Sequence, residues 1–256
     1  MNGQQSARPG GHSRASRVIL AVMIAAVILL VVWAISAVAG ALAVVKSVGI
    51  VDTAGNSPYS EAQVSEAAGV SVGMRKNDFD TAEAEAAVLE KLPFVSRVEV
   101  RKRAGGKVEI TLTCQTPKYA ATIAGEQYLL SEDMRVLGIG ASGEGILPLE
   151  LPRVRRAIAG QTVSFFEDSG YIGETLGTLY ASPLADRLDS VDLSDRYSVR
   201  LLYGDRFTVR LGDTSDMESK LETAARLISD ASLADSPQAT IDVSDLRHPT
   251  VRRTGE

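Results

Sequence analysis

A run of 28 residues without a charged side chain, Val18 to Val45, constrains this chain more than any other feature. About 20 apolar residues in a row are enough for a helix to cross the hydrocarbon core of a bilayer. A cleaved signal peptide is the alternative, because the small residues near the end of the run would fit a cleavage pattern: Ala37, Ala39, Ala41 and Ala43. The apolar region of a signal peptide spans only about 7–15 residues, which is much shorter than this run. The run therefore predicts a retained transmembrane helix over residues 18–45.

The charges on either side of the run predict its orientation. Arg8, Arg14 and Arg17 precede it without any acidic residue, and Lys46 is the first charge after it. Because basic residues favour the cytoplasmic side, we expect the polar tail of residues 1–17, predicted to be disordered, in the cytoplasm. Everything after Lys46 is then expected outside the cytoplasmic membrane.

The part of the chain after the run is acidic. It carries all 32 Asp and Glu residues but only 24 of the 27 Lys and Arg residues, for a net charge near −8. This balance argues against nucleic acid as a partner. Cys114 is the only cysteine, so no intrachain disulfide can form, and we expect it to be a small core residue rather than a nucleophile.

Residues 46–117 show a β-α-α-β-β pattern. Ser60 and Gln63 have the spacing of a capping box at the start of the first helix. Val95 to Lys102 and Lys107 to Cys114 both alternate apolar and polar side chains around a Gly-Gly turn. This alternation predicts a hairpin with one buried face.

Residues 118–247 predict a second domain, of mixed and antiparallel strands with two helices. Its clearest hairpin covers residues 198–203 and 206–211. One helix is expected over Phe166 to Tyr180, and the clearest helix has an apolar stripe that begins at Met217. A final strand is expected at Ala239 to Val243, and residues 248–256 are expected to form a tail. The whole chain is therefore predicted to be α+β.

Catalytic and cofactor motifs are weak. Gly138 to Gly143 matches G-x-G-x-x-G, but Gly145 and Pro148 follow at once and leave no room for the helix that a dinucleotide site needs. We therefore expect no cofactor. His248 with Asp242 or Asp245 could serve a serine hydrolase, yet no G-x-S-x-G elbow presents the serine.

A metal site built on histidine is also not expected. The two histidines, His12 and His248, would lie on opposite sides of the membrane. The strand at Ala239 to Val243 suggests a different kind of site, because an edge strand offers unpaired backbone groups to a partner strand. It could equally be an internal strand, and the pattern alone leaves both possibilities open.

Several segments in this order resemble one known family. Within residues 46–117 these segments are Tyr59-Ser60, Ala68-Gly69-Val70, LPFVSRVEVRKR and Gln115-Thr116-Pro117. Within residues 118–247 they are YGDRFTVRLGDTSDMESKLETAARLI and ATIDVSDLR. The first set resembles the FtsQ-type POTRA domain, and the second the β domain of the bacterial cell-division family FtsQ/DivIB. The chain departs from the family at Cys114-Gln115-Thr116 and at Glu132-Asp133-Met134-Arg135.

The resemblance implies a non-enzymatic scaffold of the division septum, anchored in the cytoplasmic membrane through residues 18–45. Its implied partners are single-pass proteins of the FtsL and FtsB/DivIC types, and through them the septal peptidoglycan synthases. The family accepts a partner strand at the last strand of its β domain. Carried to this chain, the implied partner-binding residues are Thr240, Ile241, Asp242, Val243, Leu246, Arg247, Thr250 and Val251.

Two other functions stay open beside the scaffold. One is a membrane-anchored enzyme that works outside the cytoplasm. The other is a different exported assembly protein with a POTRA domain; residues 118–256 carry few strands for the barrel that such proteins need.

Overall fold

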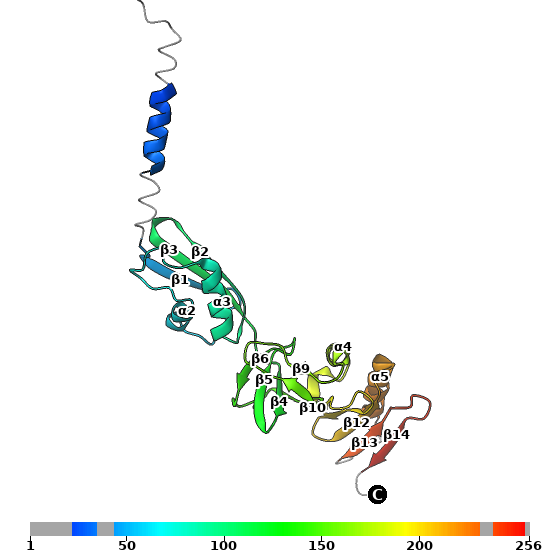
Figure 1. The fold of residues 1–256 in the computed structure, drawn as a ribbon. Helices are drawn as coiled ribbons and strands as arrows, with labels where there is room; N and C mark the ends of the chain where they lie inside the picture. Colours follow the sequence, from blue (N-terminus) through cyan, green and yellow to red (C-terminus); the bar gives the residue numbers. More distant parts are fainter. Residues whose placement is uncertain (1–21, 35–43, 231–237, 254–256) are drawn as a thin grey trace, which may run out of the picture.

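The computed structural model describes residues 22–34, 44–230 and 238–253. Residues 22–34 form a helix whose side chains are exposed (Figure 1). No helix within these three ranges is long and apolar enough to cross a membrane. The predicted tail of residues 1–17 and the other parts of the predicted anchor, residues 18–21 and 35–43, lie outside the described residues.

Residues 44–114, called the first unit below, have the predicted β-α-α-β-β order. The elements are β1 (Ser47–Asp52), α2 (Glu61–Ala67), α3 (Thr81–Lys91), β2 (Val95–Lys102) and β3 (Lys107–Cys114). The sheet order is β1-β3-β2, with β1 parallel and β2 antiparallel to β3. The two helices cover one face of this sheet (Figure 1).

Local signals in the sequence explain the first unit. The Ser60 Oγ accepts a hydrogen bond from the Gln63 N–H at 3.3 Å, and the Gln63 side chain accepts one from the Ser60 N–H at 2.9 Å, which completes the predicted capping box. Along β3 every second side chain is buried, including Ile110 and Cys114. Cys114 is a core residue as expected, and its burial raises the pKa of the thiol.

The turn between β2 and β3, a 3-10 helix at Ala104–Gly106, requires glycine. Gly105 and Gly106 have φ angles of 72° and 80°, a region that other residues rarely adopt. A Cβ atom on Gly106 would also stand 2.5 Å from the Val44 carbonyl oxygen. The turn is therefore fixed by both backbone conformation and packing.

Residues 119–253, called the second unit below, are built on one mixed sheet of nine strands. In chain order these strands are β4 (Tyr119–Ile123), β5 (Glu126–Leu130), β6 (Val136–Ile139), β7 (Leu147–Glu150), β10 (Leu188–Asp192), β11 (Val199–Tyr203), β12 (Phe207–Gly212), β13 (Ala239–Asp242) and β14 (Thr250–Arg253). In space their order is β14-β13-β12-β11-β10-β7-β4-β5-β6. The β7 strand is parallel to β4 and to β10, and β12 is parallel to β13.

Helices α4 (Gly170–Tyr180) and α5 (Met217–Ile228) lie side by side over this sheet (Figure 1). Along β12 the side chains of Phe207, Val209 and Leu211 are buried while those between them are exposed. The helices therefore cover one face, and their apolar side chains form a single core with that face of the sheet.

A short hairpin stands apart from the nine-stranded sheet. Its strands, β8 (Val154–Arg156) and β9 (Ser164–Phe165), form a separate two-stranded antiparallel sheet. A short 3-10 helix, Ala185–Arg187, follows α4.

Two predictions about the second unit are wrong in detail. A helix was expected to begin at Phe166, but α4 begins at Gly170, because the Phe166 N–H pairs with the Arg153 carbonyl oxygen. Ala239 to Val243 was expected to be the final strand, yet β14 forms within the predicted tail.

The two units meet around Pro93 and Arg135. The Arg135 Nε donates to the Pro93 carbonyl oxygen at 3.3 Å, and the Gln115 Nε2 donates to the Asp133 Oδ1 at 3.0 Å. Beside these contacts lies an open hollow of about 630 Å³, lined from both units, for example by Leu89 and Arg135.

Candidate partner-binding edge

The β13 strand, proposed from sequence as a possible edge, is an internal strand. It pairs in parallel with β12, where Ile241 lies opposite Val209, and antiparallel with β14, where Ile241 lies opposite Val251. The Ile241 and Val243 side chains are fully buried. Both neighbours therefore occupy the backbone groups of β13, and these two side chains hold the core rather than face a partner.

The strand β14 is one of the two ends of the nine-stranded sheet, and β6 is the other. The β14 strand lies at the rim of the second unit, drawn in red (Figure 1). All four of its residues are exposed, and Val251 is 38% exposed although it is apolar. Within the described residues, no strand pairs with the outer side of β14, so alternate backbone groups point away from the sheet.

Two aspartates organise the turn that leads from β13 to β14. The Asp242 Oδ1 accepts from the Ser244 N–H at 3.0 Å and from the Ser244 Oγ at 2.6 Å. The Asp245 Oδ1 accepts from the Arg247 N–H at 2.9 Å, and its Oδ2 lies 3.2 Å from the His248 Nδ1. These contacts fix where β14 begins.

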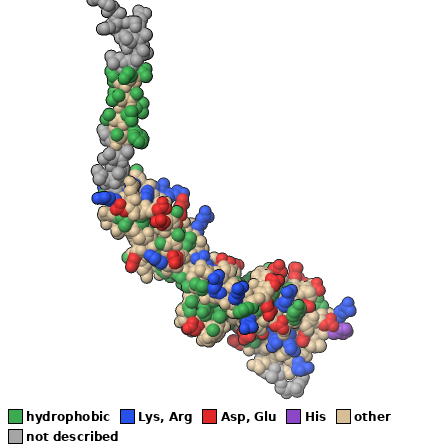
Figure 2. Space-filling view, viewed as in Figure 1, with side chains coloured by type: hydrophobic (Ala, Val, Ile, Leu, Met, Phe, Trp, Pro, Cys, Tyr) green, Lys and Arg blue, Asp and Glu red, His purple; other side chains and the backbone are tan. Residues whose placement is uncertain are grey.

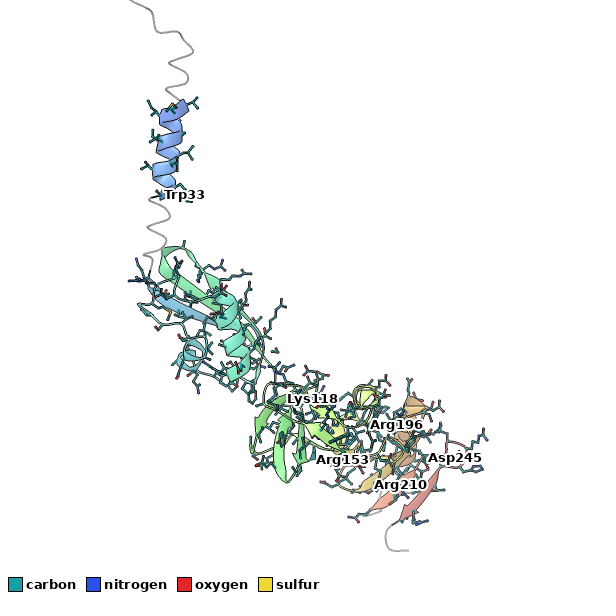
Figure 3. The ribbon with its side chains drawn as sticks, in the orientation of Figure 1. Trp33, Lys118, Arg153, Arg196, Arg210 and Asp245 are labelled. Carbon is teal, nitrogen blue, oxygen red and sulfur yellow. The ribbon has the colours of Figure 1, made fainter. Side chains whose placement is uncertain are left out.

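The same contacts set the charge state of the turn. Burial alone would raise the pKa of Asp242, but the hydrogen bonds from Ser244 and the charge of Arg210, 3.8 Å away, bring that pKa below its ordinary value. The Arg247 N–H and the His248 side chain lower the pKa of Asp245. Both carboxylates are therefore ionised at neutral pH (Figure 3 labels Arg210 and Asp245).

The structure brings the residues implied by the resemblance into one β13–turn–β14 region but exposes only some of them. Arg247, Thr250 and Val251 are exposed, whereas Thr240, Asp242 and Leu246 are half-buried. Sequence reasoning missed the exposed Arg252 and Arg253 of β14. The β-branched pair Thr250-Val251 directly after Pro249 was the available signal for a strand there.

The elements of a serine hydrolase do not come together at this turn. The Ser244 Oγ donates to Asp242, whereas His248 contacts Asp245. His12 lies outside the described residues. Among the residues that the structure describes, no group of three or more His, Cys, Asp and Glu side chains could hold a metal ion.

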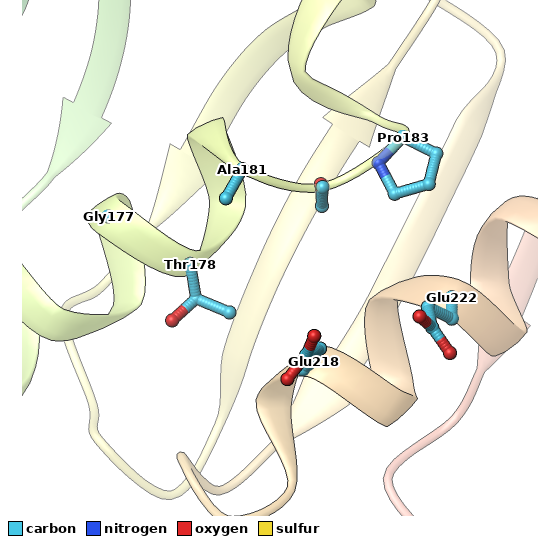
Figure 4. A pocket seen from close by; sticks show the side chains of 7 residues that line it. Gly177, Thr178, Ala181, Pro183, Glu218 and Glu222 are labelled. Carbon is cyan, nitrogen blue, oxygen red and sulfur yellow. The ribbon is translucent and has the colours of Figure 1, made fainter.

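A hollow of about 370 Å³ between α4 and α5 also lacks a catalytic set (Figure 4). Glu218 and Glu222 stand one turn apart on α5 and line it together with Thr178 and Ser182. The Thr178 hydroxyl donates to the Glu174 carbonyl oxygen and the Ser182 hydroxyl to that of Leu179. Both hydroxyls are thus engaged by the backbone, and neither contacts a base.

The G-x-G-x-x-G segment starts within β6 and continues into a loop. The next element after it is β7, a strand, so no helix N-terminus faces the glycines. The Gly143 N–H instead donates to the Gln127 Oε1 at 3.3 Å, and a Cβ atom at Gly143 would meet the Ala120 Cβ at 2.6 Å. Gly143 therefore serves close packing of the loop, whereas a Cβ atom at Gly140 would meet nothing within 4 Å.

Comparison with known proteins gives a family for each unit. Residues 46–113 match the family model described as POTRA domain, FtsQ-type. Residues 120–247, half of the chain, match the model described as cell division protein FtsQ/DivIB, C-terminal. No curated protein matches the chain. The second match ends before β14 begins.

Proposed function

The chain belongs to the FtsQ/DivIB family of cell-division proteins, and from this premise we propose that it is a non-enzymatic scaffold that receives a partner strand at β14. A role in cell division follows from the family itself. The observation that carries the finer proposal is the position of β14 at the end of the nine-stranded sheet, with exposed side chains along its whole length.

The binding mode that this edge supports is the addition of a partner strand. A partner strand would pair with the outward N–H and C=O groups of β14 and extend the sheet, and side chains would supply the specificity. The β14 strand carries Arg252 and Arg253, and the exposed Arg247 lies in the turn before it. These cations favour a partner strand flanked by acidic residues.

We propose partners of the FtsL and FtsB/DivIC types, by analogy with the family, and an indirect effect on septal peptidoglycan synthesis. The chain is proposed to hold its two units outside the cytoplasmic membrane through an anchor over residues 18–45. The uncharged run and the three arginines before it support this topology.

The test uses two neighbouring residues of β14, Val251 and Arg252. In an antiparallel edge strand, the N–H groups of successive residues point alternately toward the neighbouring strand and away from the sheet. Proline removes the N–H group, so one of Val251→Pro and Arg252→Pro deletes an inward donor and the other an outward donor. Each variant is therefore the control for the other.

Binding of purified full chain to an FtsB/DivIC-type partner is measured together with thermal stability. The variant that keeps its stability is expected to lose about tenfold or more in affinity, because it lacks an outward donor. If that variant binds the partner like the unchanged protein, strand addition at β14 is wrong.

A further inference from the structure

The hairpin of β8 and β9 carries an unusual concentration of arginines. Arg153, Arg155 and Arg156 fall within four consecutive positions, and all three are exposed. We call residues 153–166 the arginine hairpin. Figure 2 shows blue side chains gathered over the region of β9, between areas that carry many acidic side chains.

None of these three arginines forms an ion pair with any residue that the structure describes. Arg155 and Arg156 instead line an open hollow of about 490 Å³ together with Ser164. The chain as a whole is acidic, with a net charge of −5, yet none of its described acidic side chains pairs with these arginines. Three neighbouring like charges repel one another, and a ligand with negative charges would relieve that repulsion.

An exposed aromatic ring lies next to the arginines. Phe166 is 59% exposed, and the Arg153 guanidinium carbon lies 4.7 Å from the centre of its ring. The stacked contact orders both side chains before any ligand arrives. Arginine and aromatic residues are enriched at protein–protein interfaces, and they are common among the residues that contribute most of the binding energy.

We propose that the arginine hairpin is a docking surface for an acidic segment of a protein partner. Carboxylates of that segment pair with Arg155 and Arg156, and an apolar side chain of it covers Phe166. Phosphate or another small anion would use the arginines but would gain nothing from the exposed ring. The aromatic contact therefore favours a protein over a simple polyanion.

This surface is separate from the strand-accepting edge. The arginine hairpin is attached beside β6, where Arg135 bridges to Thr162 and the Val163 N–H donates to the Met134 carbonyl oxygen. Because β6 and β14 are the two ends of the nine-stranded sheet, the hairpin is attached at the end opposite the strand-accepting edge. A partner bound at β14 leaves the arginine hairpin open.

The test measures binding of a short fluorescent peptide, in which glutamates alternate with leucines, to the full chain in a neutral detergent. The double variant R155E/R156E is expected to weaken binding about tenfold or more, and Phe166→Ala several-fold. The matched control is R97E/K107E, which reverses two exposed charges on the first unit. This control is expected to bind the peptide like the unchanged protein.

Several results would overturn the proposal. One is the absence of binding, and another is equal binding of a peptide with glutamine in place of glutamate. Loss of binding in R97E/K107E would show that overall charge, not this surface, attracts the peptide. Inorganic polyphosphate or anionic vesicles that compete fully, with Phe166→Ala unaffected, would assign the surface to a simple anion or a lipid headgroup.

Discussion

The Nε of Arg135 donates a hydrogen bond to the carbonyl oxygen of Pro93 at 3.3 Å, and this contact joins the second unit to the first. Pro93 follows the end of α3, and Arg135 directly precedes β6. Gly160, at the tip of the arginine hairpin, lies against the same junction: a Cβ atom there would be 3.6 Å from the Leu89 carbonyl oxygen. The turn after β5, the arginine hairpin and α3 therefore meet at one point.

This junction predicts the effect of Arg135→Ala. The change removes the hydrogen bond to Pro93 but no core side chain, so the two units should sample a wider range of orientations while each stays folded. Distance distributions between spin labels at Arg97 and Arg200, one exposed site on each unit, measure that range. Lys107→Ala, at another exposed cation, is the control. An unchanged distribution in Arg135→Ala would mean that this contact does not hold the units.

The two separate cores predict that damage to one unit leaves the other intact. Leu221 of α5 is fully buried, and Leu221→Ala should lower the free energy of unfolding of the second unit by about 2–5 kcal/mol. Amide hydrogen exchange of full chain would show faster opening in β12 but not in β3, since the latter belongs to the other core. Glu222→Ala, at the next and exposed residue, should change neither.

An ion pair between the buried Lys220 and the exposed Asp213 predicts the acid response of the second unit. The Lys220 side chain is only 3% exposed, and its Nζ donates to the Asp213 Oδ1 at 2.6 Å. This hydrogen bond, with one from Ser215, lowers the pKa of Asp213 from 3.8 to about 2. A lowered carboxyl pKa adds stability that is present above the unfolded-state pKa and is lost as pH falls toward the folded-state value.

The unchanged protein should therefore lose this contribution between about pH 4 and pH 2. Lys220→Met removes the cation and keeps most of the side-chain volume, so the variant should lack that part of the pH dependence. Urea unfolding followed by circular dichroism across this range measures the difference. Parallel pH profiles for the two proteins would contradict the assignment to Lys220 and Asp213.

The proposed anchor predicts how the chain distributes in cells. Ile28→Lys with Leu30→Lys places two charges in the middle of the uncharged run, each at a cost of about 3 kcal/mol for insertion. The double variant should shift from the membrane fraction to the soluble fraction or be degraded, and the matching double alanine variant should not. A double lysine variant that stays in the membrane fraction would contradict the anchor.

Local features of the fold were predictable from the sequence, because neighbouring residues decide them. Ser60 and Gln63 are three positions apart and cap a helix by themselves. The alternation of apolar and polar side chains along β3 arises because one face of the strand is buried. The turn at Gly105-Gly106 forms because glycine readily adopts positive φ angles. The order of the first unit followed from these signals.

The strand order of the second unit and its edge were not predictable in this way. Pairing of β7 with β10 joins segments about 40 residues apart, and no local pattern encodes it. The β14 strand is four residues long with no buried side chain, so it has no alternation to recognise. The β8 strand also lacks a recognisable pattern, because the consecutive Arg155 and Arg156 break the alternation of apolar and polar residues.

The measurement that tests the account most directly is amide hydrogen exchange of the full chain with and without an FtsB/DivIC-type partner at saturation. Added pairing at the sheet edge predicts slower exchange in β14, around Val251 and Arg252, while β5 and β6 at the other end of the sheet keep their rates. Unchanged exchange in β14 while the partner is bound would contradict strand addition at this edge.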